Sequence, residues 1–303
     1  MKILGIDIGG TEIKCAFCDH GVFGKKFAVE THAREGVDAV KRSIAKVVTE
    51  ALDSSESDGA VAAGISCAGN IDNKKGKVVG ATGYIPGWAG FEVADFVKNV
   101  SGLSSFADND AYCALYGELY YGAAKEYDDV CMLTLGTGVG GAVALDKKVL
   151  HGKDFTAGRL GHITLHPNGK KCDCGRLGCV EQYLSGRAFT EGAVKAGFDI
   201  KHGSEMFALA KSDDKADDYC RAFFGELKYV AQTLENAFDP EILLIGGGMA
   251  NSYSDWKKYI DEFADDFSFK ILPATLGNSA GIIGAAAYAE NMLEYNVGAE
   301  KKR

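Results

Sequence analysis

The sequence predicts an α/β protein with two lobes. Apolar segments typical of strands alternate with segments whose apolar residues recur at helical spacing. A strand, a glycine turn and a second strand follow one another near the N-terminus, and the same arrangement returns in the second half of the chain. A length of 303 residues suits two domains. We expect an N-terminal lobe over residues 1–108 and a larger C-terminal lobe over residues 109–281, with a C-terminal helix at about 282–303 packing back on the first lobe.

The composition argues against several classes of function. A net charge of −9 lacks the basic face that nucleic-acid binding requires. The N-terminal residues do not form the apolar region of a signal peptide, and the uncharged segment 130–145 is too short and too rich in glycine to span a bilayer. We therefore expect a cytoplasmic protein that binds neither nucleic acid nor a membrane.

The first hairpin combines glycines with an acid. Strands are predicted at 2–8 and 12–17, with a glycine turn at 9–11 and Asp7 just before it. Backbone amides freed by glycines can approach a phosphate, and a carboxylate beside them can hold Mg²⁺. The alternative is an ordinary hairpin whose glycine pair serves only the turn and binds no phosphate.

The first lobe continues as alternating helices and strands. We predict helices at 36–52 and 91–100, and strands at 59–66 and 105–107. Asp108-Asn109-Asp110 then precedes a predicted helix at 111–124. Such residues are ordinary N-caps, but three in a row exceed what capping needs. An acid at a strand-to-helix turn is well placed to accept a proton from a hydroxyl.

The second hairpin repeats the first. Strands are predicted at 130–135 and 142–145 around a glycine turn at 136–141. A strand follows the turn where a Rossmann fingerprint would open a helix, and the chain has no P-loop motif. Two related hairpins suggest a duplicated fold that closes on one nucleotide.

The rest of the second lobe holds a third glycine turn. Helices are predicted at 181–196, 219–238, 256–267 and 282–293. A buried type of strand at 242–245 leads into Gly246-Gly247-Gly248, where backbone can again approach a ligand.

The cysteines fall into two kinds. Residues 157–186 are polar and rich in glycine, and they carry His162 and three closely spaced cysteines. Three thiolates and one imidazole suggest zinc, of the structural kind because four protein ligands leave no open position; reduced, metal-free cysteines are the alternative. Cys15 and Cys18 lie in a predicted strand at an odd spacing, which points them to opposite faces as small buried residues.

Four motifs together resemble the ROK family of sugar kinases and related repressors: IDIGGTEIK, NDA, LGTGVGG, and GH followed by CDCGRLGCVE. The resemblance covers nearly the whole chain. It implies an actin-like fold of two α/β lobes, ATP with Mg²⁺, and transfer of the γ-phosphoryl group to a hexose hydroxyl, usually at C6. It also implies a homodimer.

The resemblance assigns roles residue by residue. Asp110 matches the catalytic base. The positions matched to sugar contacts are Asn109, Asp110, Arg159, His162 and Glu181. The zinc ligands are matched by His162, Cys172, Cys174 and Cys179. The positions matched to nucleotide and metal binding are Asp7, Gly9, Gly10, Thr11, Lys14, Gly136, Thr137, Gly138, Gly140, Gly246 and Gly247.

Two positions depart from the family pattern. Arg159 stands where the family's sugar kinases carry a glutamate that bonds sugar hydroxyls, and Tyr84 stands for an asparagine in the turn at 83–88. An arginine offers donors only. It either pairs with Glu181 and points away, or reads an acceptor that glucose lacks, such as an N-acetyl carbonyl or a keto group. Glucose is the first expectation, and N-acetylmannosamine, fructose or allose are the alternatives.

Two readings without catalysis compete with a kinase. A repressor of the same family needs an N-terminal helix-turn-helix, and the first predicted strand begins too early in this chain to leave room for one. A sugar sensor with a degraded active site is suggested only by Arg159 and Tyr84.

Overall fold

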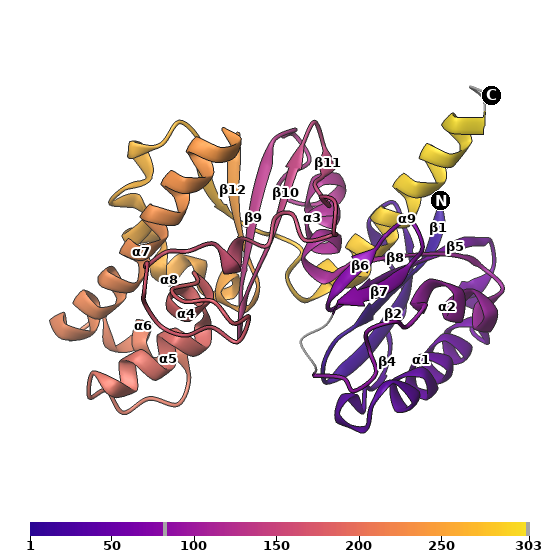
Figure 1. Cartoon of the computed structure of the whole chain (residues 1–303), viewed down its shortest axis with the longest axis horizontal. Coiled ribbons are helices and arrows are strands. Elements are labelled where there is room, and N and C mark those ends of the chain that lie inside the picture. The colour runs from indigo at the N-terminus through magenta and orange to yellow at the C-terminus, as the bar shows by residue number, and fades with distance from the viewer. Residues whose placement is uncertain (81–83, 301–303) are drawn as a thin grey trace. The chain divides into compact units, whose positions relative to one another are not determined.

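The computed structural model describes residues 1–80 and 84–300, with the side chains of 296–300 left out. Residue 83, in the turn that carries Tyr84, lies outside the described residues. The chain forms two compact units (Figure 1). Unit 1 consists of Met1–Lys125, His151–Ala157 and Asn278–Arg303, and unit 2 consists of Glu126–Leu150 and Gly158–Gly277.

Unit 1 contains a mixed sheet. Its strands are β1 (Lys2–Ile8), β2 (Glu12–Asp19), β3 (Val22–Phe23), β4 (Phe27–Glu30), β5 (Ala60–Cys67) and β8 (Ser104–Asn109). The order is β3-β2-β1-β5-β8, and β4 also pairs with β2. β1 and β2 form the predicted antiparallel hairpin, while β5 and β8 extend the sheet in parallel. A separate hairpin joins β6 (Asn70–Asp72) and β7 (Lys77–Gly80).

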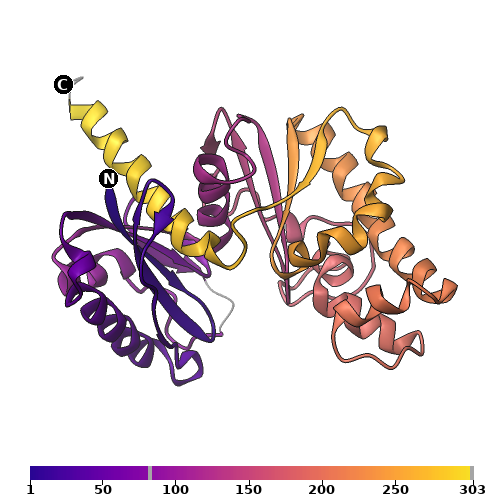
Figure 2. The ribbon, with the colours of Figure 1, turned by 180° about the vertical axis from the view of Figure 1, so that it is seen from behind.

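Helices cover both faces of this sheet. One core includes the buried faces of α1 (Val37–Leu52) and α2 (Val93–Ser101). Helix α9 (Ala280–Glu300) packs on β1 and β5, and it also packs on α3 (Asp110–Tyr121), as Figures 1 and 2 show. Short 3₁₀ turns complete the unit: η1 (Ala33–Glu35), η2 (Ser55–Ser57) and η6 (Gly277–Ser279), the last of which begins on the final residue of unit 2.

The two cysteines of β2 face opposite cores, as their spacing predicts. Cys15 belongs to the core with α1, and Cys18 belongs to the core with α9. Burial raises the pKa of each thiol to about 12. A thiol with so high a pKa is rarely present as the reactive thiolate, so the environment of both cysteines suits packing rather than redox chemistry.

Unit 2 repeats the plan of the first sheet. Its order is β11 (Lys148–Val149), β10 (Val139–Leu145), β9 (Val130–Leu135), β12 (Ile242–Gly246) and β13 (Lys270–Pro273). β9 and β10 are an antiparallel hairpin, and β12 and β13 add to it in parallel. The remaining elements are η3 (Leu160–His162), α4 (Glu181–Leu184), α5 (Gly186–Lys195), α6 (Gly203–Leu209), α7 (Asp214–Phe238), η4 (Gly248–Ser252), α8 (Tyr253–Asp261) and η5 (Ala264–Asp266).

The predicted α/β class with a hairpin in each half is thus observed, but some boundaries differ. The first unit continues past residue 108, because α3 packs on α9 and therefore belongs to unit 1. The segment His151–Ala157 also belongs to unit 1. The helix predicted at 256–267 ends at Asp261 and is followed by η5. Among the described residues, no helix has both the length and the apolar character needed to cross a membrane.

Close packing of α9 depends on glycines in the strands beneath it. A Cβ atom on Gly64 of β5 would overlap the carbonyl group of Ala285 in α9. We predict that Gly64→Ala lowers the free energy of unfolding by about 1–3 kcal/mol, because added core volume forces backbone shifts. Gly225→Ala in α7, where a Cβ meets nothing within 4 Å, is the control and should be neutral or slightly stabilising. Calorimetric melting compares them, and equal melting temperatures would contradict the prediction.

Candidate active site

The parallel strands of unit 1 bring polar side chains to one edge. The register places Asp7 of β1 opposite Ser66 of β5, and Ser66 opposite Asp108 of β8. The Ser66 hydroxyl donates to Asp7 Oδ1 at 3.0 Å. Burial raises the pKa of Asp7, while the Ser66 hydrogen bond and the Lys14 charge lower it. A partly desolvated carboxylate at the ends of parallel strands is suited to a divalent cation.

The first glycine turn follows directly. Gly9 N–H donates to the Glu12 carbonyl at 3.1 Å, and the Thr31 hydroxyl donates to the Gly9 carbonyl at 2.8 Å. These bonds hold the turn while Gly10 and Thr11 stay exposed. A Cβ on Gly10 would stand 3.0 Å from the Tyr84 ring, so this tyrosine lies beside the turn.

Asn109 and Asp110 lie where β8 passes into α3. Asn109 caps the helix, because its Oδ1 accepts the N–H of Ala111 at 2.9 Å, and its Nδ2 donates to the Gly69 carbonyl at 2.9 Å. The Asp110 carboxylate accepts the same Ala111 N–H at 2.9 Å. The cap thus sets the backbone from which the predicted base projects.

The Asp110 carboxyl has a raised pKa. Its side chain keeps exposed surface, yet its crowded surroundings remove enough hydration to raise the pKa to about 6. The Ala111 N–H opposes this rise, and the negative charge of Asp7 adds to it. A carboxyl with a pKa near neutrality is suited to general base catalysis.

The second glycine turn is held within unit 2. Gly136 N–H donates to the Gly138 carbonyl at 3.0 Å, and the Gly136 carbonyl accepts the Gly186 N–H at 2.7 Å. Gly247, at φ 77°, begins the third glycine turn, and a Cβ there would overlap Leu135. The second and third turns therefore lie side by side, with Thr137 exposed between the strands of its hairpin.

The helix predicted at 181–196 is broken at Ser185, which was not expected. The Ser185 hydroxyl accepts the Ala188 N–H at 3.1 Å and caps a new helix, α5. A serine that caps a new helix interrupts a continuous one, and here α4 ends before Ser185 and α5 begins after it. As a result, the first amide of α5, on Gly186, is the one that bonds Gly136.

Glu181 contacts the second hairpin directly. Its Oε2 accepts the Val139 N–H at 3.0 Å, and its Oε1 lies 3.9 Å from the Cys172 sulfur. The predicted sugar ligand therefore links the glycine hairpin to the cysteine cluster. The sequence placed Glu181 near the cluster but held no signal for its bond to the hairpin.

His162 and the three cysteines come together in unit 2, as predicted. Their ligand atoms all lie within 4.8 Å of one another. The Cys174 and Cys179 sulfurs are 3.6 Å apart, and the Cys172 sulfur is 3.7 Å from His162 Nδ1. Zinc–sulfur bonds of about 2.3 Å in a tetrahedron separate sulfurs by about 3.8 Å. The cluster has the donors and the size for a structural zinc ion.

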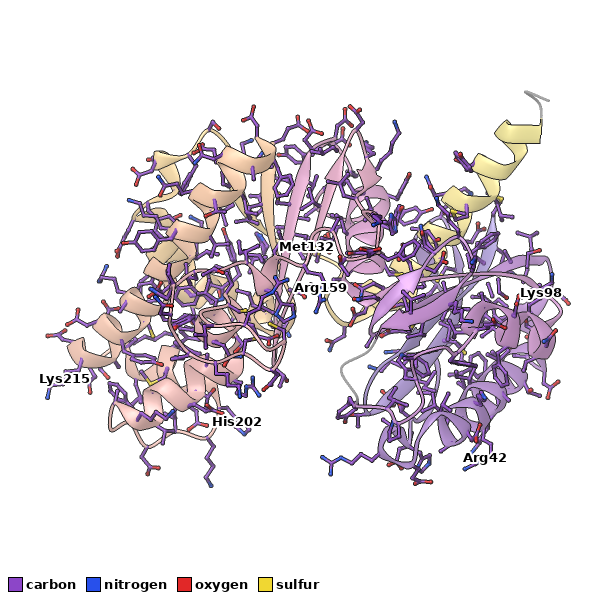
Figure 3. The ribbon with its side chains drawn as sticks, in the orientation of Figure 1. Arg42, Lys98, Met132, Arg159, His202 and Lys215 are labelled. Atoms are coloured by element: carbon purple, nitrogen blue, oxygen red, sulfur yellow. The ribbon has the colours of Figure 1, made fainter. Side chains whose placement is uncertain are left out.

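Arg159, which is labelled in Figure 3, is exposed and immediately precedes η3, which ends at His162. Arg159 and Glu181 are both among the described residues and form no ion pair with each other, so the pairing considered from the sequence is not observed. Burial lowers the pKa of His162, the Arg159 charge lowers it further, and Glu181 opposes both. A neutral imidazole is the form that binds zinc.

Comparisons with known proteins agree with this geometry. The family model described as ROK family matches residues 3–292. A glucokinase of Thermotoga maritima is 31% identical, over 97% of this chain and 98% of that protein. An N-acetylmannosamine kinase of Haemophilus influenzae is 29% identical, over 97% of both chains.

A solved structure extends the likeness to three dimensions. A ROK family glucokinase from Streptomyces griseus, in complex with glucose and AMPPNP, superposes with a TM-score of 0.77 and 30% identity, covering 94% of this chain and 98% of that chain. The actin-like α/β fold that the resemblance implied is confirmed. By a family match over almost its whole length, the chain belongs to the ROK family.

Proposed function

We propose that this protein transfers the γ-phosphoryl group of ATP to a hydroxyl group of a hexose, with Asp110 as the general base. The protein is an ATP-dependent sugar kinase of the ROK family, as its full-length likeness to glucokinases indicates. The observation that carries the proposal is Asp110 itself, a carboxyl with a pKa of about 6 at the capped start of α3.

The proposed reaction is an in-line displacement. The sugar oxygen forms a bond to the γ-phosphorus, the bond from that phosphorus to the β,γ-bridging oxygen breaks, and ADP leaves. Asp110 accepts the proton of the attacking hydroxyl. Because its pKa is about 6, the carboxyl is mostly ionised at neutral pH and is ready to accept that proton.

Both glycine hairpins are proposed to bind phosphates. The turn at Gly9, Gly10 and Thr11, near Lys14, and the turn at Gly136, Thr137, Gly138 and Gly140 offer backbone amides to anionic oxygens. Asp7 is proposed to hold Mg²⁺, which would neutralise phosphate charge in a reaction whose catalysis is mainly positioning and electrostatics. The turn at Gly246 and Gly247 is proposed to lie beside the adenosine.

The sugar contacts are proposed to come from Asn109, Asp110, Arg159, His162 and Glu181. Asn109 has limited capacity, because its oxygen caps α3, one amide hydrogen bonds Gly69, and its side chain also hydrogen-bonds Asp110. Glu181 commits one oxygen to Val139. His162 turns Nδ1 to Cys172, which leaves Nε2 for a hydroxyl.

A structural zinc ion bound by His162, Cys172, Cys174 and Cys179 is proposed to hold the sugar-binding segment rigid. Its chemistry would be structural, since four protein ligands complete a tetrahedron. The proposed compartment is the cytoplasm, where ATP is available and thiolates stay reduced. A homodimer remains a prediction.

Arg159 favours a second candidate substrate. An exposed guanidinium beside the His162 segment offers donors where a glutamate would offer acceptors. A hexose with a carbonyl substituent, such as N-acetylmannosamine, or a ketose would suit it better than glucose. A sugar-binding regulator without catalysis is less favoured, because Asp7 and Asp110 are both present.

The role of Asp110 predicts a loss of turnover. Asp110→Asn keeps an acceptor for the Ala111 N–H but cannot take a proton, so kcat should fall roughly 10²–10⁴-fold. Wild-type kcat/KM should fall as the pH drops through about 6, because the base must be ionised and its pKa is about 6. Coupled ADP-release assays over pH 5–8 measure both. Near-normal turnover of the variant would exclude Asp110 as the base.

The cysteine cluster predicts bound zinc. Purified protein should contain about one zinc ion per chain, and Cys174→Ser should lower both the metal content and the melting temperature of the protein, because a structural metal contributes folding free energy. His166→Gln, a nearby histidine outside the cluster that pairs with Glu226, should keep the metal. Elemental analysis decides, and equal zinc in both variants would contradict the assignment.

Arg159 predicts the order of substrate preference. We expect Arg159→Glu to raise the kcat/KM for glucose relative to N-acetylmannosamine and fructose by roughly tenfold, the scale of one charged hydrogen bond. A panel of hexoses assayed on wild type and variant checks this. Identical preference orders would show that Arg159 does not select the substrate, and no phosphorylation of any hexose would overturn the proposed function.

A further inference from the structure

The segment His151–Ala157, which we call the strap, interrupts unit 2. It follows β11 and leads to Gly158 and Arg159 in unit 2, yet it belongs to unit 1. The Ala157 N–H donates to the His151 carbonyl at 3.1 Å, so the strap closes on itself as a loop. Both of its ends bond to the region where β8 meets α3.

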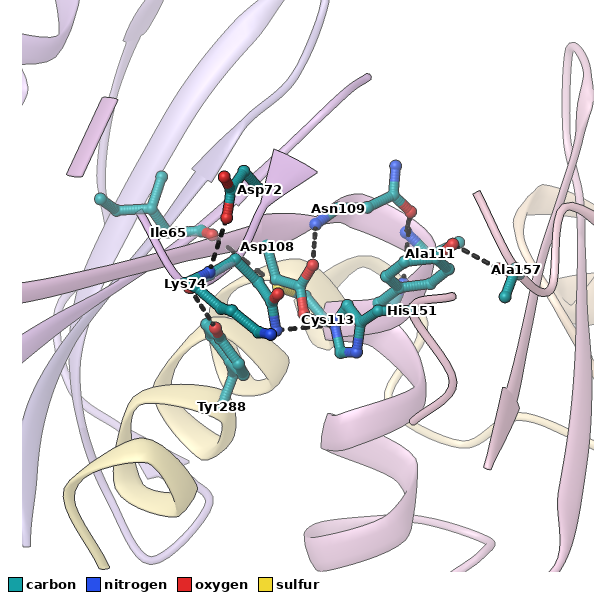
Figure 4. A network of polar contacts seen from close by, with 12 residues as sticks. Ile65, Asp72, Lys74, Asp108, Asn109, Ala111, Cys113, His151, Ala157 and Tyr288 are labelled. Atoms are coloured by element: carbon teal, nitrogen blue, oxygen red, sulfur yellow. Dashed lines mark hydrogen bonds and ion pairs between the residues drawn. The ribbon is translucent and has the colours of Figure 1, made fainter. Parts of the chain in front are cut away.

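The first end is held by a buried acid. His151 Nε2 lies 2.6 Å from Asp108 Oδ2, and the Asp108 side chain is 0% exposed while that of His151 is 15% exposed (Figure 4). Burial raises the pKa of Asp108, and the hydrogen bond with His151 is the first of the effects that lower it. Asn73 Nδ2 lies 3.2 Å from the same histidine nitrogen. A buried carboxylate such as Asp108 needs a partner like His151, because leaving it unpaired is costly.

The second end is held by a tyrosine. The Tyr112 hydroxyl donates to the Ala157 carbonyl. Tyr112 is buried in the first turn of α3, two residues after Asp110, and its ring meets the His151 ring edge-on at 5.2 Å between centroids. The same tyrosine therefore contacts both ends of the strap.

The residues that hold the strap also hold the predicted base. Asp108 Oδ1 accepts the Asn109 N–H at 2.8 Å, while its Oδ2 faces His151. Asn109 in turn caps α3, where Asp110 is the first residue. A displacement of the strap would act on the Asp110 backbone through Asp108. At its other end, Ala157 is only two residues from Arg159.

We propose that Asp108, His151 and Tyr112 form a positioning clip that holds the strap against the start of α3 and thereby fixes the backbone of the base Asp110. The inference rests on the proposed kinase function and extends it to residues that are not among the proposed substrate contacts. The clip acts on the sugar side of the reaction, because the glycine hairpins proposed to bind ATP take no part in it. A clip that only stabilises the fold would change melting but not sugar kinetics.

The sharpest test removes one hydroxyl. Tyr112→Phe keeps the buried ring and deletes the bond to Ala157, so kcat/KM for the sugar should fall about threefold to tenfold, the range for one hydrogen bond. The KM for ATP should change less than about twofold. Tyr219→Phe is the matched control, because it deletes a hydroxyl-to-carbonyl bond of 2.6 Å to Phe189 in unit 2, and it should leave the sugar kinetics unchanged.

A second pair of variants tests the histidine. His151→Phe removes the donor to Asp108, and His151→Gln restores one, so the glutamine variant should recover part of the sugar kcat/KM that the phenylalanine variant loses. Equal losses in the two variants would overturn the role of the His151–Asp108 bond. Tyr112→Phe does not depend on these variants folding.

Hydrogen exchange at the Ala157 amide follows the strap without an activity assay. It should become at least about threefold faster in Tyr112→Phe and stay unchanged in Tyr219→Phe. Unchanged exchange in Tyr112→Phe would overturn the proposed clip. Faster exchange with unchanged sugar kinetics would show that the contact stabilises the strap but does not position Asp110. Failure of the proposed function would give a different result, because the wild-type protein would then phosphorylate no hexose. In that case hydrogen exchange at the Ala157 amide would still show whether Tyr112 holds the strap.

Discussion

The register of three parallel strands in unit 1 is the constraint on which the candidate site depends. Asp7, Ser66 and Asp108 lie opposite one another on β1, β5 and β8. A slip of one residue would turn each side chain to the other face of the sheet. The register is secured because both faces are buried, with glycines such as Gly64 allowing α9 to approach closely.

That register brings together carboxylates that repel one another, and each carboxylate has different neighbouring groups. Asp108 is buried and paired with His151. Asp7 receives a hydrogen bond from Ser66 and the charge of Lys14, and it remains suited to a cation. Asp110 accepts the Ala111 N–H, while burial and the negative charge of Asp7 raise its pKa to about 6. Different surroundings thus separate three acids into a positioning group, a proposed metal ligand and a proposed base.

Unit 2 has a comparable sheet, but the loop that carries the three cysteines lies outside its strands. Its polar loop has little apolar core of its own, and the His162 and cysteine cluster gathers it around one point. Glu181 extends this order to the second hairpin by accepting the Val139 N–H. The cap at Ser185 brings Gly186 to the carbonyl of Gly136. Polar contacts therefore hold this part of unit 2 together.

The sequence by itself determined the class of fold, both hairpins, the Cys/His cluster and the family, because these depend on local periodicity, glycine positions and short spacings. It also placed Asp110 at the start of a helix. Only the tertiary structure decided that His151 joins Asp108, that Glu181 bonds Val139 and that α3 stays with α9. Those contacts join residues far apart in the chain, and no local pattern of residue types records which distant groups a fold will bring within hydrogen-bond reach.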